Sequence, residues 1–244
     1  MLKRLVLEPT SCTVFLSLLS PFGLPAHRTF GANGRVIYED THGKRTDLGT
    51  GFSPVLTSDG RVALLRGRKF GYGDDFNCGK KQERNWVAVY DPVTRIENVL
   101  FDRAVNFDGG KWKSCVFEQM QLSHDGSVLY LVSPVYATSG SLAIVSLAEA
   151  TIKDVPGVCE VYVIETGPHR DELIYVRRVF HNSPDLGEHP TYPFIHARAD
   201  GRPIREVSDE WSGQDNMPRD KMPLLRNYLR RIDGTINVNG ETLP

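Results

Sequence analysis

Four short turns of the type Asn-Gly or Asp-Gly recur along the chain, and each leads into a strand-like segment. Their glycines are Gly34, Gly60, Gly126 and Gly201. Asn-Gly and Asp-Gly supply the positive φ angles that tight hairpins require, and β-branched or aromatic residues typically follow them. One such turn is common in any protein, whereas four in similar settings predict repeated antiparallel hairpins.

The segments around the second and third turns predict two four-stranded units. The expected strands are 52–57, 61–66, 86–90 and 96–101 in the first unit, and 118–122, 128–133, 141–147 and 151–155 in the second. Four-stranded antiparallel meanders that bury both faces are typical of β-propeller blades. Two polar insertions, 67–84 and 102–114, make the repeat longer than a bare blade.

The last third of the chain predicts a third sheet and one helix. Longer strand pairs are expected at 159–165 with 172–180, and at 191–198 with 204–207, with a loop between the pairs. From residue 220 the apolar residues follow helical spacing to Ile232, and a short strand pair (235–238, 241–243) ends the chain. A short basic amphipathic helix of this kind packs on its own domain more often than it binds a membrane. We therefore predict an all-β fold of propeller-like antiparallel β-meanders, as a small or irregular propeller with one C-terminal helix.

The turn sequences resemble those of a known family. Residues 53–54 (SP) leading to 58–61 (SDGR), and residues 122–126 (LSHDG), resemble the S-x-D-G turns of TolB-like six-bladed propeller repeats. Residues 90–94 (YDPVT) are similar to the D-x-x-T turn between the outer strands of those blades. The resemblance covers residues 30–155 and extends to WD40-like repeats. It implies a propeller, and the small number of clear units implies an irregular or incomplete one.

Composition limits the classes of partner. Lys and Arg total 29 against 30 Asp and Glu, for a net charge of −1, so no global positive field gathers nucleic acid. Beyond the N-terminus no apolar run approaches the roughly 20 residues that cross a bilayer, so the chain is not expected to span a membrane. Residues 27–244 are expected to form a single propeller-like domain.

The N-terminus has the outline of a signal peptide over residues 1–26. Lys3 and Arg4 precede an apolar stretch at 13–25, although Glu8 and Pro9 interrupt the pattern. The alternative is a first buried strand. Export predicts a periplasmic or secreted protein, and the alternative predicts a cytoplasmic one.

The four cysteines contain no C-x-x-C pair, which argues against zinc knuckles and redox dithiols. Cys78 and Cys115 lie in polar loops beside one strand pair and form a candidate disulfide in an oxidising compartment. Cys159 begins an apolar strand and is expected to be a buried thiol. Unpaired thiols throughout, in a cytoplasmic protein, are the alternative.

The common catalytic motifs are absent, since the sequence has no G-x-S-x-G, H-E-x-x-H, Walker or G-x-G-x-x-G pattern. This favours a non-enzymatic protein. Asp74 and Asp75, with Asp108, offer oxygen ligands of the kind that Ca²⁺ takes, although glycine-flanked acids are usually a solvated loop. No other cofactor is expected.

Four histidines, at 169, 181, 189 and 196, lie in the third segment. No pair has the i, i+4 spacing of helical ligands, and no ligand set is complete, so a structural or surface role is expected for each.

Large aromatic and arginine side chains suggest a binding surface. Trp86, Trp112, Arg177 and Tyr192 are the candidates, because such residues dominate interaction hot spots. Ordinary sheet packing with cation–π contacts is the alternative. The sequence thus predicts an exported, non-enzymatic binding or protein-interaction module that holds another protein or a small ligand on its loop face. A calcium-dependent propeller hydrolase or lactonase and a toxin-neutralising immunity-type protein are the alternatives.

Overall fold

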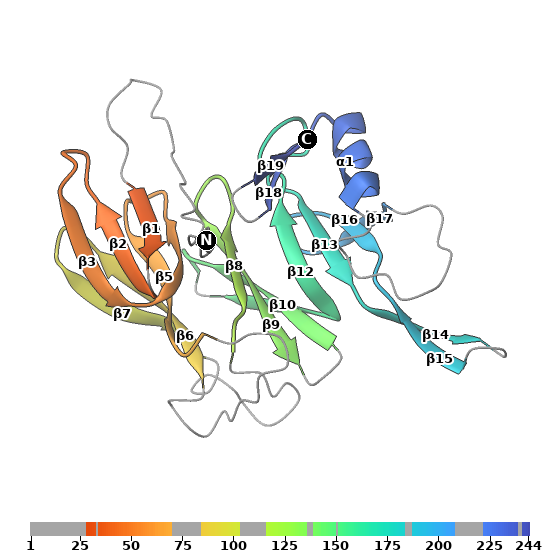
Figure 1. Cartoon of the computed structure of the whole chain (residues 1–244), viewed down its shortest axis with the longest axis horizontal. Coiled ribbons are helices and arrows are strands. Elements are labelled where there is room, and N and C mark those ends of the chain that lie inside the picture. The colour runs from red at the N-terminus through yellow and green to blue at the C-terminus, as the bar shows by residue number, and fades with distance from the viewer. Residues whose placement is uncertain are drawn as a thin grey trace, which may run out of the picture.

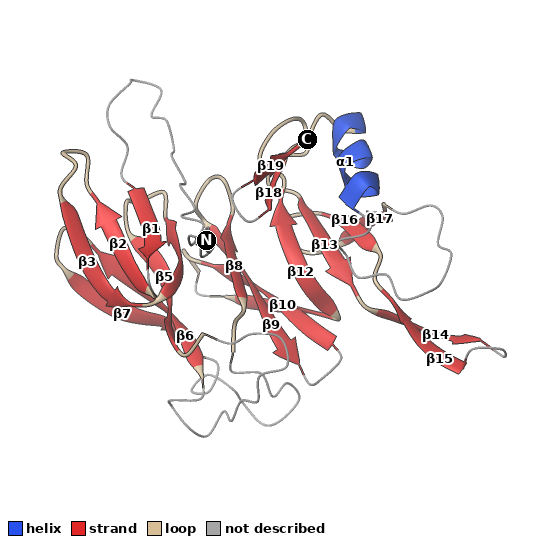
Figure 2. Cartoon of the chain, in the orientation of Figure 1, coloured by secondary structure: helices blue, strands red, loops and turns tan. Residues whose placement is uncertain are grey.

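The computed structural model describes residues 28–32, 34–69, 84–102, 116–135, 139–149, 151–183, 187–207, 222–238 and 241–244. Strands dominate this part of the chain, with one helix at its C-terminal end (Figures 1 and 2). No helix within these ranges is long and apolar enough to cross a membrane. The predicted signal peptide and most of the two polar insertions lie outside the described residues.

Four antiparallel sheets follow one another along the chain. The first sheet contains β1 (Arg28–Ala32), β2 (Arg35–Glu39) and β3 (Arg45–Thr50). The second contains β4 (Phe52–Leu56), β5 (Val62–Gly67), β6 (Asn85–Asp91) and β7 (Ile96–Phe101). The third contains β8 (Gln119–Leu122), β9 (Val128–Val135), β10 (Ser139–Ser146) and β11 (Ile152–Pro156). The fourth has the order β12 (Val158–Val163), β13 (Leu173–Arg177), β16 (Phe194–Ala197) and β17 (Pro203–Glu206).

Three smaller elements complete the described structure. The β14 (Val179–Ser183) and β15 (Gly187–Thr191) hairpin extends from the fourth sheet, where the sequence predicted a loop. Helix α1 (Met222–Arg231) and the hairpin of β18 (Ile236–Val238) and β19 (Glu241–Leu243) follow, close to the predicted bounds. The prediction of a loop was wrong because antiparallel strands can pair even where the sequence is rich in turn-forming residues.

The Asp-Gly turns have the expected glycine conformation but a different role for the aspartate. Gly60 and Gly126 have φ angles of 82° and 73°, whereas neither preceding aspartate has a positive φ. Instead, Asp59 Oδ1 accepts a hydrogen bond from Thr57 Oγ1 at 2.6 Å. In the next sheet Asp125 Oδ1 accepts one from Ser123 Oγ, also at 2.6 Å. The aspartate therefore closes the turn through its side chain, while the glycine alone supplies the left-handed backbone.

The sheets stack face to face, and each interface has its own apolar core. Successive side chains along a strand point to opposite faces of its sheet. Each middle sheet therefore has apolar side chains on both faces and packs against two neighbouring sheets. The second sheet packs on the first through Val62, Leu64 and Ala88, and on the third through Ala63, Leu65, Val87 and Val89. The third sheet packs on the fourth through Tyr130, Val132, Leu142 and Ile144. The outer face of the fourth sheet packs on α1 and the β18–β19 hairpin.

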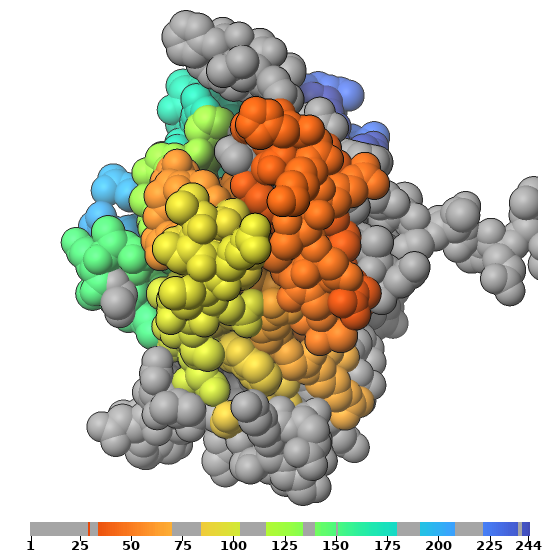
Figure 3. Space-filling model, turned by 90° about the vertical axis from the view of Figure 1, so that its left-hand side faces the viewer, coloured from red at the N-terminus to blue at the C-terminus, as the bar shows by residue number. Residues whose placement is uncertain are grey.

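The stack is an open arc. The outer face of the first sheet carries ion pairs, Arg35 with Asp47 and Arg45 with Glu39, each at 2.7 Å. Figure 3 shows the first and second sheets, in orange and yellow, at this end of the molecule. At the other end α1 covers the fourth sheet, and among the described residues no apolar cluster joins the first sheet to the fourth. Polar or capped ends keep a stack of repeats soluble. The structure confirms the prediction of propeller-like antiparallel meanders with one C-terminal helix.

Amide side chains, one partly and one fully buried, join neighbouring sheets. Gln119 Nε2 on β8 donates to the Val161 carbonyl on β12 at 2.6 Å, and its Oε1 accepts from the Val161 amide at 3.1 Å. Asn85 makes the same two-way contact with the Phe117 backbone, at 2.9 and 2.7 Å. These amides satisfy backbone groups at the seams between sheets, where no strand partner is available.

Candidate functional site

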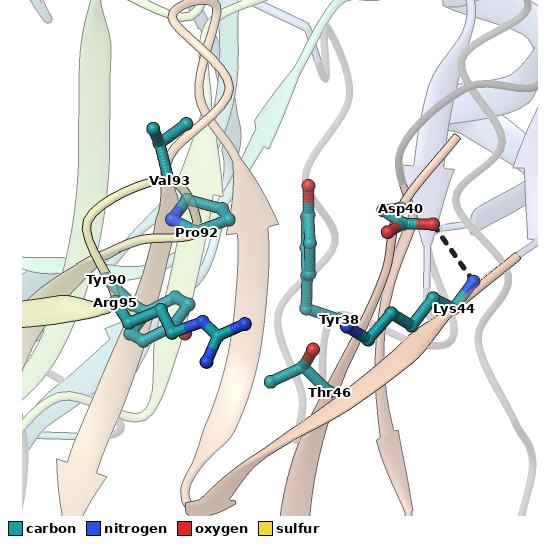
Figure 4. A pocket seen from close by; sticks show the side chains of 8 residues that line it. All are labelled: Tyr38, Asp40, Lys44, Thr46, Tyr90, Pro92, Val93 and Arg95. Carbon is teal, nitrogen blue, oxygen red and sulfur yellow. Dashed lines mark hydrogen bonds between the residues drawn. The ribbon is translucent and has the colours of Figure 1, made fainter. Parts of the chain in front are cut away.

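A groove lies at the seam between the first and second sheets. It has a volume of about 160 Å³ and is lined by Tyr38, Asp40, Lys44, Thr46, Tyr90, Pro92, Val93 and Arg95 (Figure 4). Burial raises the pKa of the Tyr38 phenol, and the Asp40 carboxylate adds to this effect. The phenol is therefore neutral at physiological pH and presents an apolar ring with a polar tip.

Two tight turns hold the walls of the groove. In the β2–β3 turn, Asp40 Oδ1 accepts hydrogen bonds from the backbone amides of His42 and Lys44, each at 2.9 Å. In the β6–β7 turn, Asp91 Oδ1 accepts from the Val93 amide at 2.8 Å, which holds the pKa of this carboxyl below its usual range. The turn projects Val93 into solvent with 91% of its surface exposed.

Strand β7 continues this surface along the edge of the second sheet. It is the last strand in the sheet order, and no described strand pairs with its outer edge. Ile96 and Val99 are 55% and 61% exposed. The only charged residue on β7, Glu97, is engaged by Arg66 in an ion pair.

Of the three predicted binding residues that the structure describes, Trp86 lies in the second sheet and the other two lie in the region of the fourth. Trp86 lies on β6 and packs partly buried against the core between the first two sheets. Arg177 is exposed on β13, and Tyr192 is half-buried after β15, in the fourth sheet region. The Arg178 guanidinium lies 5.8 Å from the centre of the Tyr192 ring, which is the cation–π packing stated as the alternative. Trp112 lies outside the described residues.

The predicted metal and disulfide residues also lie outside the described ranges. These are Asp74, Asp75, Asp108, Cys78 and Cys115. Cys159 is described as a free, half-buried thiol on β12, and burial raises its pKa, which makes it less reactive.

A second site lies at the opposite end of the arc, between the fourth sheet and α1. His169 lies in the turn before β13, Glu172 immediately precedes that strand, and His196 lies on β16. Glu172 Oε2 is 2.8 Å from His169 Nδ1 and 2.7 Å from His196 Nε2. The ligand atoms of the three residues all lie within 4.8 Å of one another.

His196 is held from behind by helix α1. Its Nδ1 lies 2.7 Å from the Tyr228 hydroxyl, which also accepts a hydrogen bond from Arg205 Nε at 2.8 Å. The imidazole is only 1% exposed, and this burial lowers its pKa despite the nearby Glu172 carboxylate. The side chain is therefore neutral at pH 7, with one nitrogen facing Tyr228 and the other facing Glu172.

The sequence analysis treated His169 and His196 separately and did not predict that they lie close together. The register that pairs Ile174 on β13 with His196 on β16 carries His196 to the end of β13 where Glu172 lies. The spacing of three between His169 and Glu172 was visible in the sequence, but the third member depends on strand pairing.

No protein-family model matches this sequence, and no curated protein matches it. Among solved structures, the chain is similar to the β-propeller domain of the Trilobed protease from Pyrococcus furiosus, described as having an open velcro topology. That match has a TM-score of 0.46 and 12% identity, over 76% of this chain and 54% of that one. TolB from Acinetobacter baumannii matches with a TM-score of 0.43 and 15% identity, over 72% of this chain and 38% of that chain.

A third similar structure is the acylaminoacyl peptidase of Pyrococcus horikoshii, with a TM-score of 0.44 and 12% identity, over 75% of this chain and 30% of that chain. This chain thus spans between 30% and 54% of the three structures. The similarity agrees with the resemblance to TolB-like repeats predicted from the turns, and it concerns the fold alone.

Proposed function

We propose that this protein is a non-enzymatic protein-interaction module that binds an extended segment of a partner along the edge of β7. The observation that carries the proposal is the outer edge of β7, which no described strand pairs with. This strand has two exposed aliphatic side chains, Ile96 and Val99, on its opposite faces, and the exposed Val93 lies in the turn before it. Extended peptides commonly bind by adding a strand to such an edge, with pockets for alternate side chains.

The edge strands of the third and fourth sheets differ from β7 in a way that supports the proposal. Exposed sheet edges are normally protected by charges or proline, because they otherwise pair with foreign strands. β11 carries Lys153 and Asp154, and β17 begins with Pro203 and carries Arg205 and Glu206. β7 has only Glu97, whose charge is already paired with Arg66.

The groove supplies a place for a partner side chain. It opens beside the β6–β7 turn, at the end of β7 that begins with Ile96. Two tyrosine rings give the groove apolar surface with polar tips. Among its lining residues the two cationic side chains, Lys44 and Arg95, outnumber the one carboxylate, Asp40. We therefore expect the bound segment to alternate aliphatic side chains and to carry an acidic or hydroxyl side chain at the groove.

Selection of random peptides on phage tests the proposal. Peptides enriched on the wild-type protein should bind at least about tenfold more weakly to Val99→Lys, because the lysine places a charge beside the edge at which the added strand would pair. Ile152→Lys, at the exposed position on β11, is the matched control and should bind normally. Failure to enrich any peptide, or equal binding by Val99→Lys, would refute the proposal. Concentration-dependent dimers abolished by Val99→Lys would instead assign the edge to a second copy of the chain.

Export is a further part of the proposal, supported by the basic and apolar pattern of residues 1–26. The intact mass of protein recovered from an expressing cell tests it, since cleavage near residue 26 removes the apolar segment. The same measurement, with and without reduction, tests the proposed bridge between Cys78 and Cys115. A full-length, fully reduced chain would contradict both.

A further inference from the structure

The cluster at the far end of the arc has a buried nitrogen without a hydrogen-bond partner. His196 Nε2 lies 2.7 Å from Glu172 Oε2 but makes no hydrogen bond with it in this geometry. His196 is 1% exposed, so bulk solvent does not contact this nitrogen in the structure. An unsatisfied polar atom of this kind is costly and calls for a ligand.

We propose that His169, Glu172 and His196 form a binding site for one divalent transition-metal ion, with zinc the best match to the ligand set. Two imidazoles and one carboxylate are a common three-ligand set of zinc sites that keep an open position. Calcium is a poor match, because it prefers six or more oxygen ligands.

The surroundings of His196 suit a metal ligand. With the proton on Nδ1, that nitrogen donates to the Tyr228 oxygen at 2.7 Å and leaves the Nε2 lone pair directed at the cluster. Metal-bound histidines usually donate their second nitrogen to such a partner, which fixes the ring and its tautomer. Arg205 Nε donates to the same oxygen and so fixes the position of the tyrosine.

The other two ligands provide access and adjustment. His169 and Glu172 have 37% and 28% of their side-chain surface exposed, so an ion can enter and a water can occupy the fourth position. Neighbouring ligand atoms around tetrahedral zinc are about 3.3 Å apart when each bond is about 2.0–2.1 Å. Glu172 Oε2 now lies 2.8 Å from His169 Nδ1 and 2.7 Å from His196 Nε2, which is closer than this. Binding therefore requires the Glu172 carboxylate to move away from the two histidines by about 0.5 Å.

A bound ion would join two segments of the fourth sheet. The turn before β13 supplies His169 and Glu172, strand β16 supplies His196, and Tyr228 extends the contact to α1. This cluster is independent of the β7 surface, because it lies on the fourth sheet rather than the first two.

Titration of untagged, chelator-treated protein with Co²⁺ and Zn²⁺ tests the assignment. We expect one Co²⁺ per chain with the intense visible absorption of a tetrahedral site, displaced by Zn²⁺. Glu172→Gln and His169→Gln should each weaken Zn²⁺ binding by about 100-fold or more. Tyr228→Phe should weaken it by about 10–100-fold, as loss of a partner that orients a ligand typically does.

Controls separate loss of the site from loss of the fold. His42→Gln, in the exposed β2–β3 turn, should bind Zn²⁺ as the wild type does, and circular dichroism should show native strand content in every variant. His169→Gln changes a partly exposed side chain and preserves the core, so it keeps the test decisive if another variant unfolds. No tetrahedral Co²⁺ spectrum, or Zn²⁺ binding unchanged in Glu172→Gln and His169→Gln, would overturn the proposal.

Discussion

Replacing Asn85 by alanine tests the idea that buried amides hold neighbouring sheets together. Asn85 is fully buried on β6, and its Nδ2 donates to the carbonyls of Phe117 and Arg68 at 2.9 and 3.1 Å. Its Oδ1 accepts from the Phe117 amide at 2.7 Å. Alanine leaves the two backbone groups of Phe117 without this partner in the interior between the second and third sheets.

The expected loss follows from the cost of unsatisfied buried groups. Each costs about 1–3 kcal/mol, so the two groups of Phe117 together predict a loss of about 2–6 kcal/mol in the free energy of unfolding. Against a typical total of about 5–15 kcal/mol this is a large change. With a urea m-value of about 2–3 kcal/mol/M, the midpoint of unfolding should fall by about 1–3 M.

Urea unfolding followed by circular dichroism measures this change. Asn98→Ala, at an exposed position on β7, is the matched control and should change stability by less than about 0.5 kcal/mol. Asn85→Asp retains the acceptor for the Phe117 amide but loses both donors and buries a carboxylate, so it should be no more stable than Asn85→Ala. The reasoning is wrong if Asn85→Ala costs less than about 1 kcal/mol or matches the control.

Three further changes test other parts of the fold. Gly140→Ala should destabilise the protein by more than about 2 kcal/mol in thermal unfolding, because a Cβ there would lie 2.0 Å from the Val158 carbonyl oxygen. As the control, Gly34→Ala should cost only about 1–2 kcal/mol, because Gly34 has a φ of +72° but open space around it. Equal losses in the two variants would contradict the predicted clash. Hydrogen bonds, chiefly from the neighbouring arginine, lower the pKa of Asp59 from 3.8 to about 2, so its contribution is present above pH 4 and is lost as the pH falls through 2. The side chain is half exposed, so Asp59→Asn should cost under about 1 kcal/mol at pH 6, and a gap from wild type in urea unfolding that does not narrow toward pH 2 would contradict this sign. Arg66→Lys should cost about 1–3 kcal/mol and speed proteolysis within the first sheet, since the guanidinium joins β5 to backbone carbonyls of β3; an unchanged cleavage rate would argue against that role.

Local patterns in the sequence were sufficient to predict most of the individual strands and the helix. The strands of the second and third sheets and helix α1 begin and end within about two residues of their predicted bounds, because turn glycines and side-chain caps act over only a few residues. The prediction of a loop around residues 181–190 was wrong because local composition does not report strand pairing. This segment is rich in turn-forming residues, yet β14 and β15 pair within it. The exposed edge of β7 could not be predicted from the sequence either, because the exposure of Val99 depends on which strand ends the sheet.

Which distant side chains come into contact depends on the three-dimensional packing of the elements. His169 and His196 were both visible as candidate ligands, but neither had a helical partner. Their contact through Glu172 depends on the antiparallel register of β13 and β16, and the second contact of His196 depends on α1 packing against the fourth sheet. Strand register and the packing of elements are set by the summed burial of many side chains, so no local pattern near either histidine encodes the cluster.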